Sequence, residues 1–159
     1  MIYRLIFSFI PLIGLPMIGF DIIISIFISI LLVAGTLLSK NRGWIPQLQS
    51  VTLVLLYAIS IFGYLNQGYN HFELILILVS MGYLFSGLFG FFLENTKLAI
   101  IFSIIFWSFE AASIALLAFQ KIGIPGILVS LILFLLIAYR DYRKIILSKN
   151  KINEDQIDQ

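Results

Sequence analysis

The sequence predicts an all-α integral membrane protein, a polytopic bundle of about six transmembrane helices with both ends of the chain in the cytoplasm. Two observations of composition point to this fold class: 61% of the 159 residues are hydrophobic and only 11% are charged. Soluble domains have about 25% charged residues, so this chain lacks the polar side chains that would cover a water-exposed surface. The third observation is that charges gather between apolar runs of about 20 residues, the length that spans a bilayer.

The first two spans are expected at 3–19 and 22–39. Asp21 is the charge that separates them, and we interpret it as the N-cap of the second helix after a tight glycine turn. Pro11 and Pro16 predict a kink or partial unwinding in the first span. No A-x-A-like cleavage site follows the first apolar run, so we expect a retained helical hairpin rather than a signal peptide. Merging the two spans gives a five-helix alternative.

Four further apolar runs follow, each bounded by a polar or charged turn. Their approximate bounds are 47–65, 72–93, 98–119 and 124–140. The spans are expected to form one transmembrane domain over 1–140, followed by a charged cytoplasmic tail at 141–159. Basic residues at the start of this tail are expected to fix the topology and to attract anionic lipid headgroups.

The distribution of basic residues favours six spans over five. With six spans, nine of the ten lysines and arginines fall on one side of the membrane, and only Lys121 falls on the other. With five spans, Arg4 changes side and the split becomes eight to two. Because positively charged loops are retained in the cytoplasm, both termini are expected there. The Ile- and Phe-rich, cysteine-free composition suggests a bacterial chain, so the expected location is the bacterial inner membrane.

Glu110 is the candidate functional residue, near the middle of the predicted span 98–119. A charged residue at this depth costs about 2.5–3.5 kcal/mol on insertion scales. Ser103 and Ser113 lie on its helix face, seven residues before it and three after it. We interpret the three residues as a candidate proton or cation site that faces the bundle interior. The alternative is a protonated glutamate that hydrogen-bonds a neighbouring helix and fixes packing.

Small residues recur every four positions in the predicted span 72–93, at Gly82, Ser86 and Gly90. Such spacing flattens one helix face and lets another helix approach closely. We expect this face to pack inside the bundle. The alternative is an interface for a homo-oligomer or for a partner membrane protein.

The remaining polar residues predict neither a metal site nor a cofactor. His71 is the only histidine and the chain has no cysteine, and metal sites generally need several such ligands. His71 is therefore expected in a solvated loop, and a stripe of Ser25, Ser29 and Thr36 is expected to serve packing. The basic residues form no polybasic face, so no nucleic-acid partner is expected. With no catalytic motif in the chain, we expect no enzyme activity.

The front of the chain resembles the bacterial inner-membrane "intracellular septation protein A" family over residues 5–90. The resemblance rests on the segment FIPLI at 9–13, on a short turn into a second span, and on the segment TLVL at 52–55 after a basic turn. Members of this family are small multi-spanning proteins linked to cell division and envelope maintenance. The resemblance implies a non-enzymatic role and carries over no catalytic residue.

Three functions remain as hypotheses at this point. The first is a non-catalytic protein that acts through helix–helix or lipid contacts in cell-envelope assembly or maintenance. The second is a small transporter or channel subunit that uses Glu110 as its proton or cation site. The third is an immunity protein that intercepts a membrane-inserting toxin. In each of them the lipid bilayer is the main surrounding partner.

Overall fold

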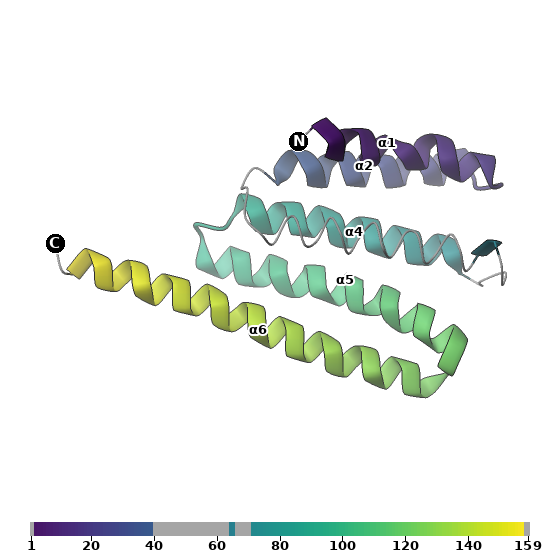
Figure 1. The fold of residues 1–159 in the computed structure, drawn as a ribbon. Coiled ribbons are helices and arrows are strands. Elements are labelled where there is room, and N and C mark those ends of the chain that lie inside the picture. Colours follow the sequence, from purple (N-terminus) through teal and green to yellow (C-terminus); the bar gives the residue numbers. More distant parts are fainter. Residues whose placement is uncertain (1, 40–63, 66–70, 158–159) are drawn as a thin grey trace.

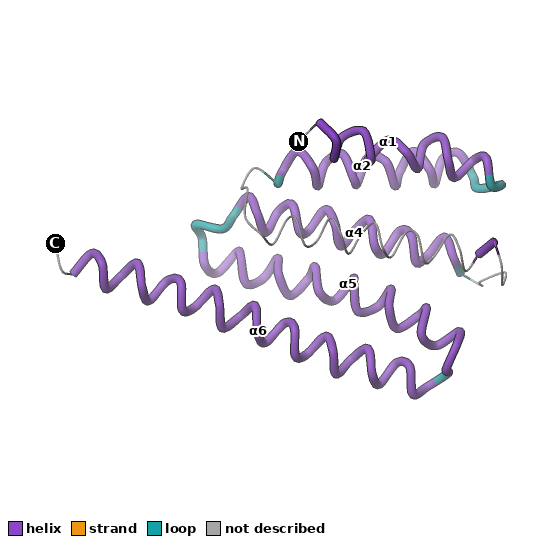
Figure 2. The backbone as a smooth tube through the Cα atoms, viewed as in Figure 1, coloured by secondary structure: helices purple, strands orange, loops and turns teal. Residues whose placement is uncertain are grey.

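Every element in the described part of the chain is an α-helix (Figures 1 and 2). The computed structural model describes residues 2–39, 64–65 and 71–157. The predicted all-α class is therefore confirmed for these residues. The helices are α1 (Ile2–Met17), α2 (Ile22–Leu38), α4 (Phe72–Phe91), α5 (Thr96–Ile122) and α6 (Ile124–Ile157).

Three of the described helices are long and apolar enough to cross a membrane. They are α4, α5 and the part of α6 up to Lys144, while α1 and α2 are shorter apolar helices. The helices pack in the sequence α1–α2–α4–α5–α6, each against the next (Figure 1). This arrangement is compatible with a membrane bundle, because all backbone groups in a helix interior are bonded within the helix itself.

The turn between α1 and α2 follows the local sequence. α1 stays helical through Pro11 and ends one residue after Pro16, short of the predicted end at residue 19. Gly19 takes a positive φ of 94°, a conformation that residues with a Cβ rarely adopt. Asp21 then accepts a hydrogen bond from the Ile23 backbone N–H at 2.7 Å, which confirms the predicted N-cap.

α2 and α4 lie side by side and run in the same direction. Near their ends Gly35 faces Gly87, and a Cβ added to Gly87 would lie 2.9 Å from the Gly35 Cα. Near their starts the rings of Phe20 and Phe72 meet edge to face, with centroids 5.0 Å apart. Parallel neighbours are compatible with one further span between them; the predicted span at 47–65 lies outside the described residues, apart from Tyr64 and Leu65.

α4 and α5 form an antiparallel hairpin joined by a short turn (Figure 2). Asn95 caps α5 by accepting from the Leu98 N–H at 3.3 Å. Phenylalanine rings stack between the two helices, with a centroid distance of 5.5 Å for Phe85 and Phe109 and again for Phe92 and Phe102. This packing holds the two helices in register.

α6 extends well beyond residue 140, where the predicted sixth span ends. It begins after Gly123, which has a φ of 73°, and continues to Ile157, so most of the predicted tail is helical. No glycine or proline occurs between residues 141 and 157 to stop the helix. Gly126 lets α6 approach α5, since a Cβ there would lie 2.7 Å from the Ala118 carbonyl oxygen. The C-terminal part of α6 projects past the ends of the other helices (Figure 1).

Candidate functional site

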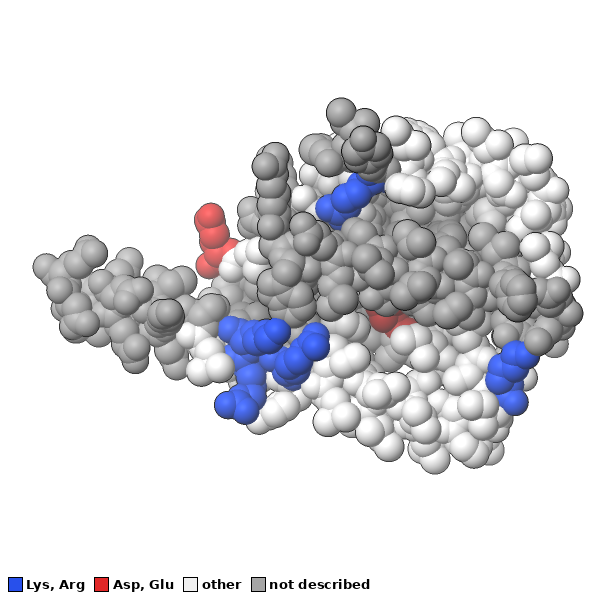
Figure 3. Space-filling model, in the orientation of Figure 1, with Lys and Arg blue, Asp and Glu red and all other residues white. Residues whose placement is uncertain are grey.

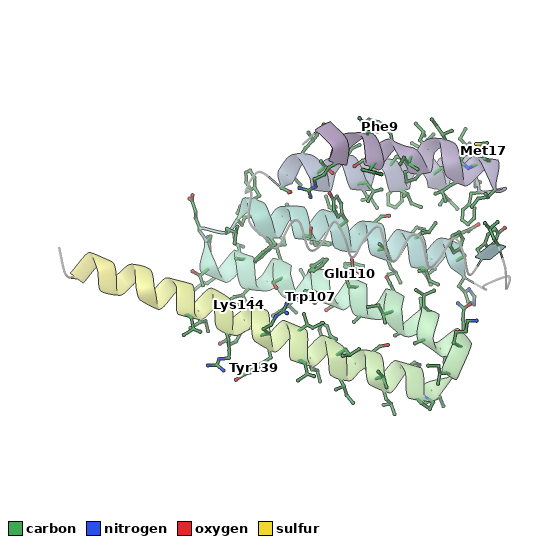
Figure 4. All side chains as sticks on the ribbon, viewed as in Figure 1. Phe9, Met17, Trp107, Glu110, Tyr139 and Lys144 are labelled. Carbon is green, nitrogen blue, oxygen red and sulfur yellow. The ribbon has the colours of Figure 1, made fainter. Side chains whose placement is uncertain are left out.

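Glu110 lies at the interface of α4 and α5, where its side chain is only 2% exposed (Figure 4). Its carboxyl group sits over Gly82 of α4: a Cβ added to Gly82 would lie 3.1 Å from Oε1 of Glu110. The same Cβ would lie 3.3 Å from the Cβ of Phe109. The space left by the missing glycine side chain is therefore the space that the carboxyl group occupies.

The structure places Ser103 and Ser113 on the buried face of α5 together with Glu110. Ser113 donates its hydroxyl hydrogen to the Phe109 carbonyl oxygen at 2.9 Å, within its own helix. This is the usual behaviour of serine in an apolar helix. The three predicted residues thus share a face, but the hydroxyl hydrogen of Ser113 is not directed at the carboxyl group.

One carboxylate oxygen of Glu110 has no hydrogen-bond partner. Among the buried side-chain atoms of the described residues, only Oε2 of Glu110 and the hydroxyl of Ser29 are in this state. A buried carboxyl oxygen needs a proton, a cation or a donor, because leaving it unpaired is costly. The described residues contain no group of three or more histidine, aspartate and glutamate side chains that could hold a metal ion. What the described residues present at this point is a single carboxyl group, which can exchange one proton.

A second polar site joins α1, α2 and α4 around Arg4, which is half-buried. Its Nη2 and Nε donate to the Tyr83 hydroxyl at 2.7 and 3.2 Å, and its Nη1 donates to the Ser39 hydroxyl at 2.9 Å. The Tyr83 hydroxyl also lies 3.1 Å from that of Thr36, which lies 3.2 Å from that of Ser8. Ser8 donates back to the Arg4 carbonyl oxygen at 2.8 Å. We call these five residues the Arg4–Tyr83 network.

The Arg4–Tyr83 network was not predicted from the sequence. Arg4 was expected only to contribute to membrane topology, Thr36 was expected in a packing stripe, and no role was predicted for Tyr83. A signal was present, because a tyrosine in the middle of an apolar span needs a partner for its hydroxyl group. The sequence could not show that the partner is an arginine 79 residues away.

Comparisons with protein families, with curated proteins and with solved structures find no match for this chain. In the Arg4–Tyr83 network the polar groups bond to one another across three helices. At Glu110 one oxygen is left without a partner. A network of bonded groups favours a structural role, whereas an unpartnered oxygen favours the binding of a ligand.

The small residues of α4 are buried and face two different neighbours. Gly82 lies against Glu110 of α5, as described above, while Gly87 lies against Gly35 of α2. Gly90 is also near α2, where an added Cβ would lie 3.8 Å from the Ser39 Cα. Ser86 is 1% exposed. Gly82, Ser86 and Gly90 therefore all lie inside the described bundle.

The remaining candidates occupy unremarkable positions. His71 is exposed and precedes α4 with a positive φ of 59°, without forming a side-chain cap. In α2, Ser25 donates to the Asp21 carbonyl oxygen at 2.9 Å, and Thr36 belongs to the Arg4–Tyr83 network. The predicted stripe of Ser25, Ser29 and Thr36 is buried, but its members do not share hydrogen-bond partners: Ser25 bonds within its own helix, and Thr36 lies within hydrogen-bond distance of Tyr83 in α4.

Charge is distributed unevenly between the two ends of the bundle. α1 begins where α2 ends, because Arg4 bonds Ser39, and α4 ends there too. Lys97 begins α5 at this same end, whereas Lys121 lies at the opposite end, where α5 meets α6. In Figure 3 the lysine and arginine side chains gather mainly toward the end where α6 leaves the bundle. Between the two ends, large apolar side chains such as Ile30, Ile104 and Leu131 are exposed.

Proposed function

We propose that this chain is a non-catalytic protein of the bacterial cytoplasmic membrane that acts through helix–helix and lipid contacts in cell-envelope assembly or maintenance. The observation that carries the proposal is the Arg4–Tyr83 network. The resemblance of residues 5–90 to the septation protein family supports the same role, although its segment at 52–55 lies outside the described residues.

The network supports a scaffold because its polar groups are already engaged. Three guanidinium nitrogens of Arg4 are bonded to hydroxyl groups of Tyr83 and Ser39. A guanidinium group held in this way would have to break these bonds before it could bind a substrate. Hydrogen bonds between helices in lipid contribute about 0.6 kcal/mol each, so several together fix the relative position of three helices.

The outward faces of the helices support contact with lipid. Large apolar side chains are strongly exposed on α1, α2 and α6, for example Met17 at 81%, Ile23 at 72% and Leu135 at 63%. Continuous apolar surface of this kind marks contact with a membrane or a partner protein.

A deletion strain tests this proposal against transport. Cells without the protein are assayed for detergent sensitivity and cell shape and, in parallel, for proton and cation uptake. We expect an envelope defect that the wild-type gene and a Glu110→Gln variant both correct, with uptake unchanged. An uptake defect with an intact envelope would contradict the proposal.

Glu110 supports a second candidate function, a small transporter or channel subunit in which it binds a proton or a cation. The specific observation is the buried Oε2 without a hydrogen-bond partner. Carboxyl groups within membrane bundles commonly mark ion or proton pathways. The narrow site over Gly82 would restrict the ligand to a small one.

Reconstituted vesicles test this second function. Wild-type protein is expected to catalyse pH-dependent cation uptake, and Glu110→Gln is expected to abolish it because the amide can release no proton and carries no charge. Glu94→Gln is the matched control, since Glu94 is exposed in the turn before α5 and should leave uptake unchanged. Equal uptake by wild-type and Glu110→Gln vesicles would remove the role assigned to Glu110.

A further inference from the structure

α6 is longer than the apolar core of a bilayer is thick. Its 34 residues correspond to about 51 Å of helix, compared with about 30 Å of hydrocarbon. The apolar part that could lie in the membrane ends at Lys144. The helix therefore continues through the interfacial region without a break.

Three basic residues lie on one face of α6 where the apolar part ends. Arg140, Arg143 and Lys144 are spaced three and four residues apart, which places them on one side of the helix. All three side chains are exposed, as are Tyr139 at 61% and Tyr142 at 45%. Figure 4 labels Tyr139 and Lys144 on α6 near the end of the bundle from which this helix projects.

The order of residues along α6 matches the layers of a membrane leaflet. Exposed apolar side chains such as Leu135 and Leu136 come first, and the exposed Tyr139 and Tyr142 are then interleaved with the three cations. Tyrosine is favoured at the headgroup level, and basic side chains extend toward phosphate groups. The acidic residues to set against these three cations are Asp141, which lies between them in the sequence of α6, and Glu94 in the turn before α5. The basic residues outnumber them, so the positive charge is in excess.

We propose that the face formed by Arg140, Arg143 and Lys144 binds the phosphate groups of anionic lipids at the end of the bundle where α6 leaves it. Charge complementarity carries the assignment, because three exposed cations at headgroup depth attract anionic rather than zwitterionic lipid. This inference deepens the lipid-contact part of the proposed function and rests on it.

Native mass spectrometry of the full-length protein in detergent tests this surface. The protein is titrated with phosphatidylglycerol and, separately, with phosphatidylcholine, and the retained lipids are counted. We expect a preference for phosphatidylglycerol that falls roughly fivefold in Arg143→Gln and disappears in the triple Arg140→Gln, Arg143→Gln, Lys144→Gln variant. Arg143→Lys should keep the preference, because it keeps the charge.

Lys121→Gln is the control, since it removes one exposed cation from the opposite end of the bundle and should not change the preference. A triple variant that folds like the wild type and retains the full preference would overturn the proposal. Displacement of the lipid by millimolar inorganic phosphate would also overturn it, in favour of a free-anion site. A triple variant that loses the lipid preference but still corrects the envelope defect of the deletion strain would support the lipid site while separating it from the proposed function.

Discussion

Tyr83 joins three helices through a single hydroxyl group. The oxygen accepts from two nitrogens of Arg4 and pairs with Thr36, while the ring packs in the apolar core with Leu76 and Ile28. In lipid the apolar surroundings of such a group offer no water as a substitute partner. The hydroxyl group should therefore contribute more to stability than one in an exposed position.

Replacing Tyr83 with phenylalanine should destabilise the bundle by about 1–2 kcal/mol, because Arg4 and Thr36 lose their common partner. The measurement is reversible unfolding in mixed micelles, followed by circular dichroism. Tyr142→Phe is the matched control and should leave stability unchanged, since Tyr142 is exposed. Equal stability of the two variants would show that the Tyr83 hydroxyl group contributes nothing to the stability of the bundle.

At the scale of the elements, the contact of α2 with α4 depends on glycine. Gly35 and Gly87 face one another so closely that a Cβ on Gly87 would overlap the Gly35 carbonyl oxygen. Backbone atoms cannot move aside as the end of a flexible side chain can. The two helices would have to separate, which would also lengthen the Tyr83 to Thr36 hydrogen bond of 3.1 Å.

Gly87→Ala should therefore destabilise the protein by about 1–3 kcal/mol, although alanine is the better helix former. Gly90→Ala is the comparison, because its Cβ would lie 3.8 Å from the Ser39 Cα, an ordinary contact. That variant should be neutral or more stable by up to about 1 kcal/mol. Unfolding in micelles measures both, and similar losses in the two variants would contradict the glycine contact.

At the scale of the whole molecule, the uneven distribution of basic residues predicts how the bundle sits in the membrane. The end with the starts of α1 and α5 carries Arg4 and Lys97, and the opposite end carries Lys121. The basic end should be cytoplasmic, because positively charged segments resist translocation.

The absence of cysteine from the sequence makes this orientation directly measurable. In intact cells a membrane-impermeant maleimide should label Lys121→Cys but not Glu94→Cys, because the two positions lie at opposite ends of α5. After lysis both should react. Labelling of Glu94→Cys alone in intact cells would reverse the predicted orientation.

Much of the fold could be predicted from local sequence. The all-α class follows from composition, and the cap at Asp21 together with the glycine turn before α2 follows from residues within a few positions of each other. The continuation of α6 past residue 140 was not predicted, because loss of hydrophobicity marks the end of a span and not the end of a helix. Residues 141–157 are polar but contain no residue that breaks a helix.

The candidate site could be predicted only in part. Glu110 was identified because a carboxyl group in the middle of an apolar run raises the free energy of membrane insertion, whichever neighbour the side chain faces. Its position over Gly82, and the bonding of Arg4 to Tyr83, join residues from different spans. No periodicity within one span carries that information.

The sequence by itself determined that this chain is helical, that it is suited to lipid, and where most of its described helices begin. Only the tertiary structure decided which helix faces meet, as at Gly35 and Gly87, and which polar groups find partners. The physical reason is the solvent. Lipid tails are as apolar as leucine, so hydrophobicity drives a helix into the membrane without selecting the face that it turns to its neighbours. Shape and hydrogen bonding between distant residues make that selection.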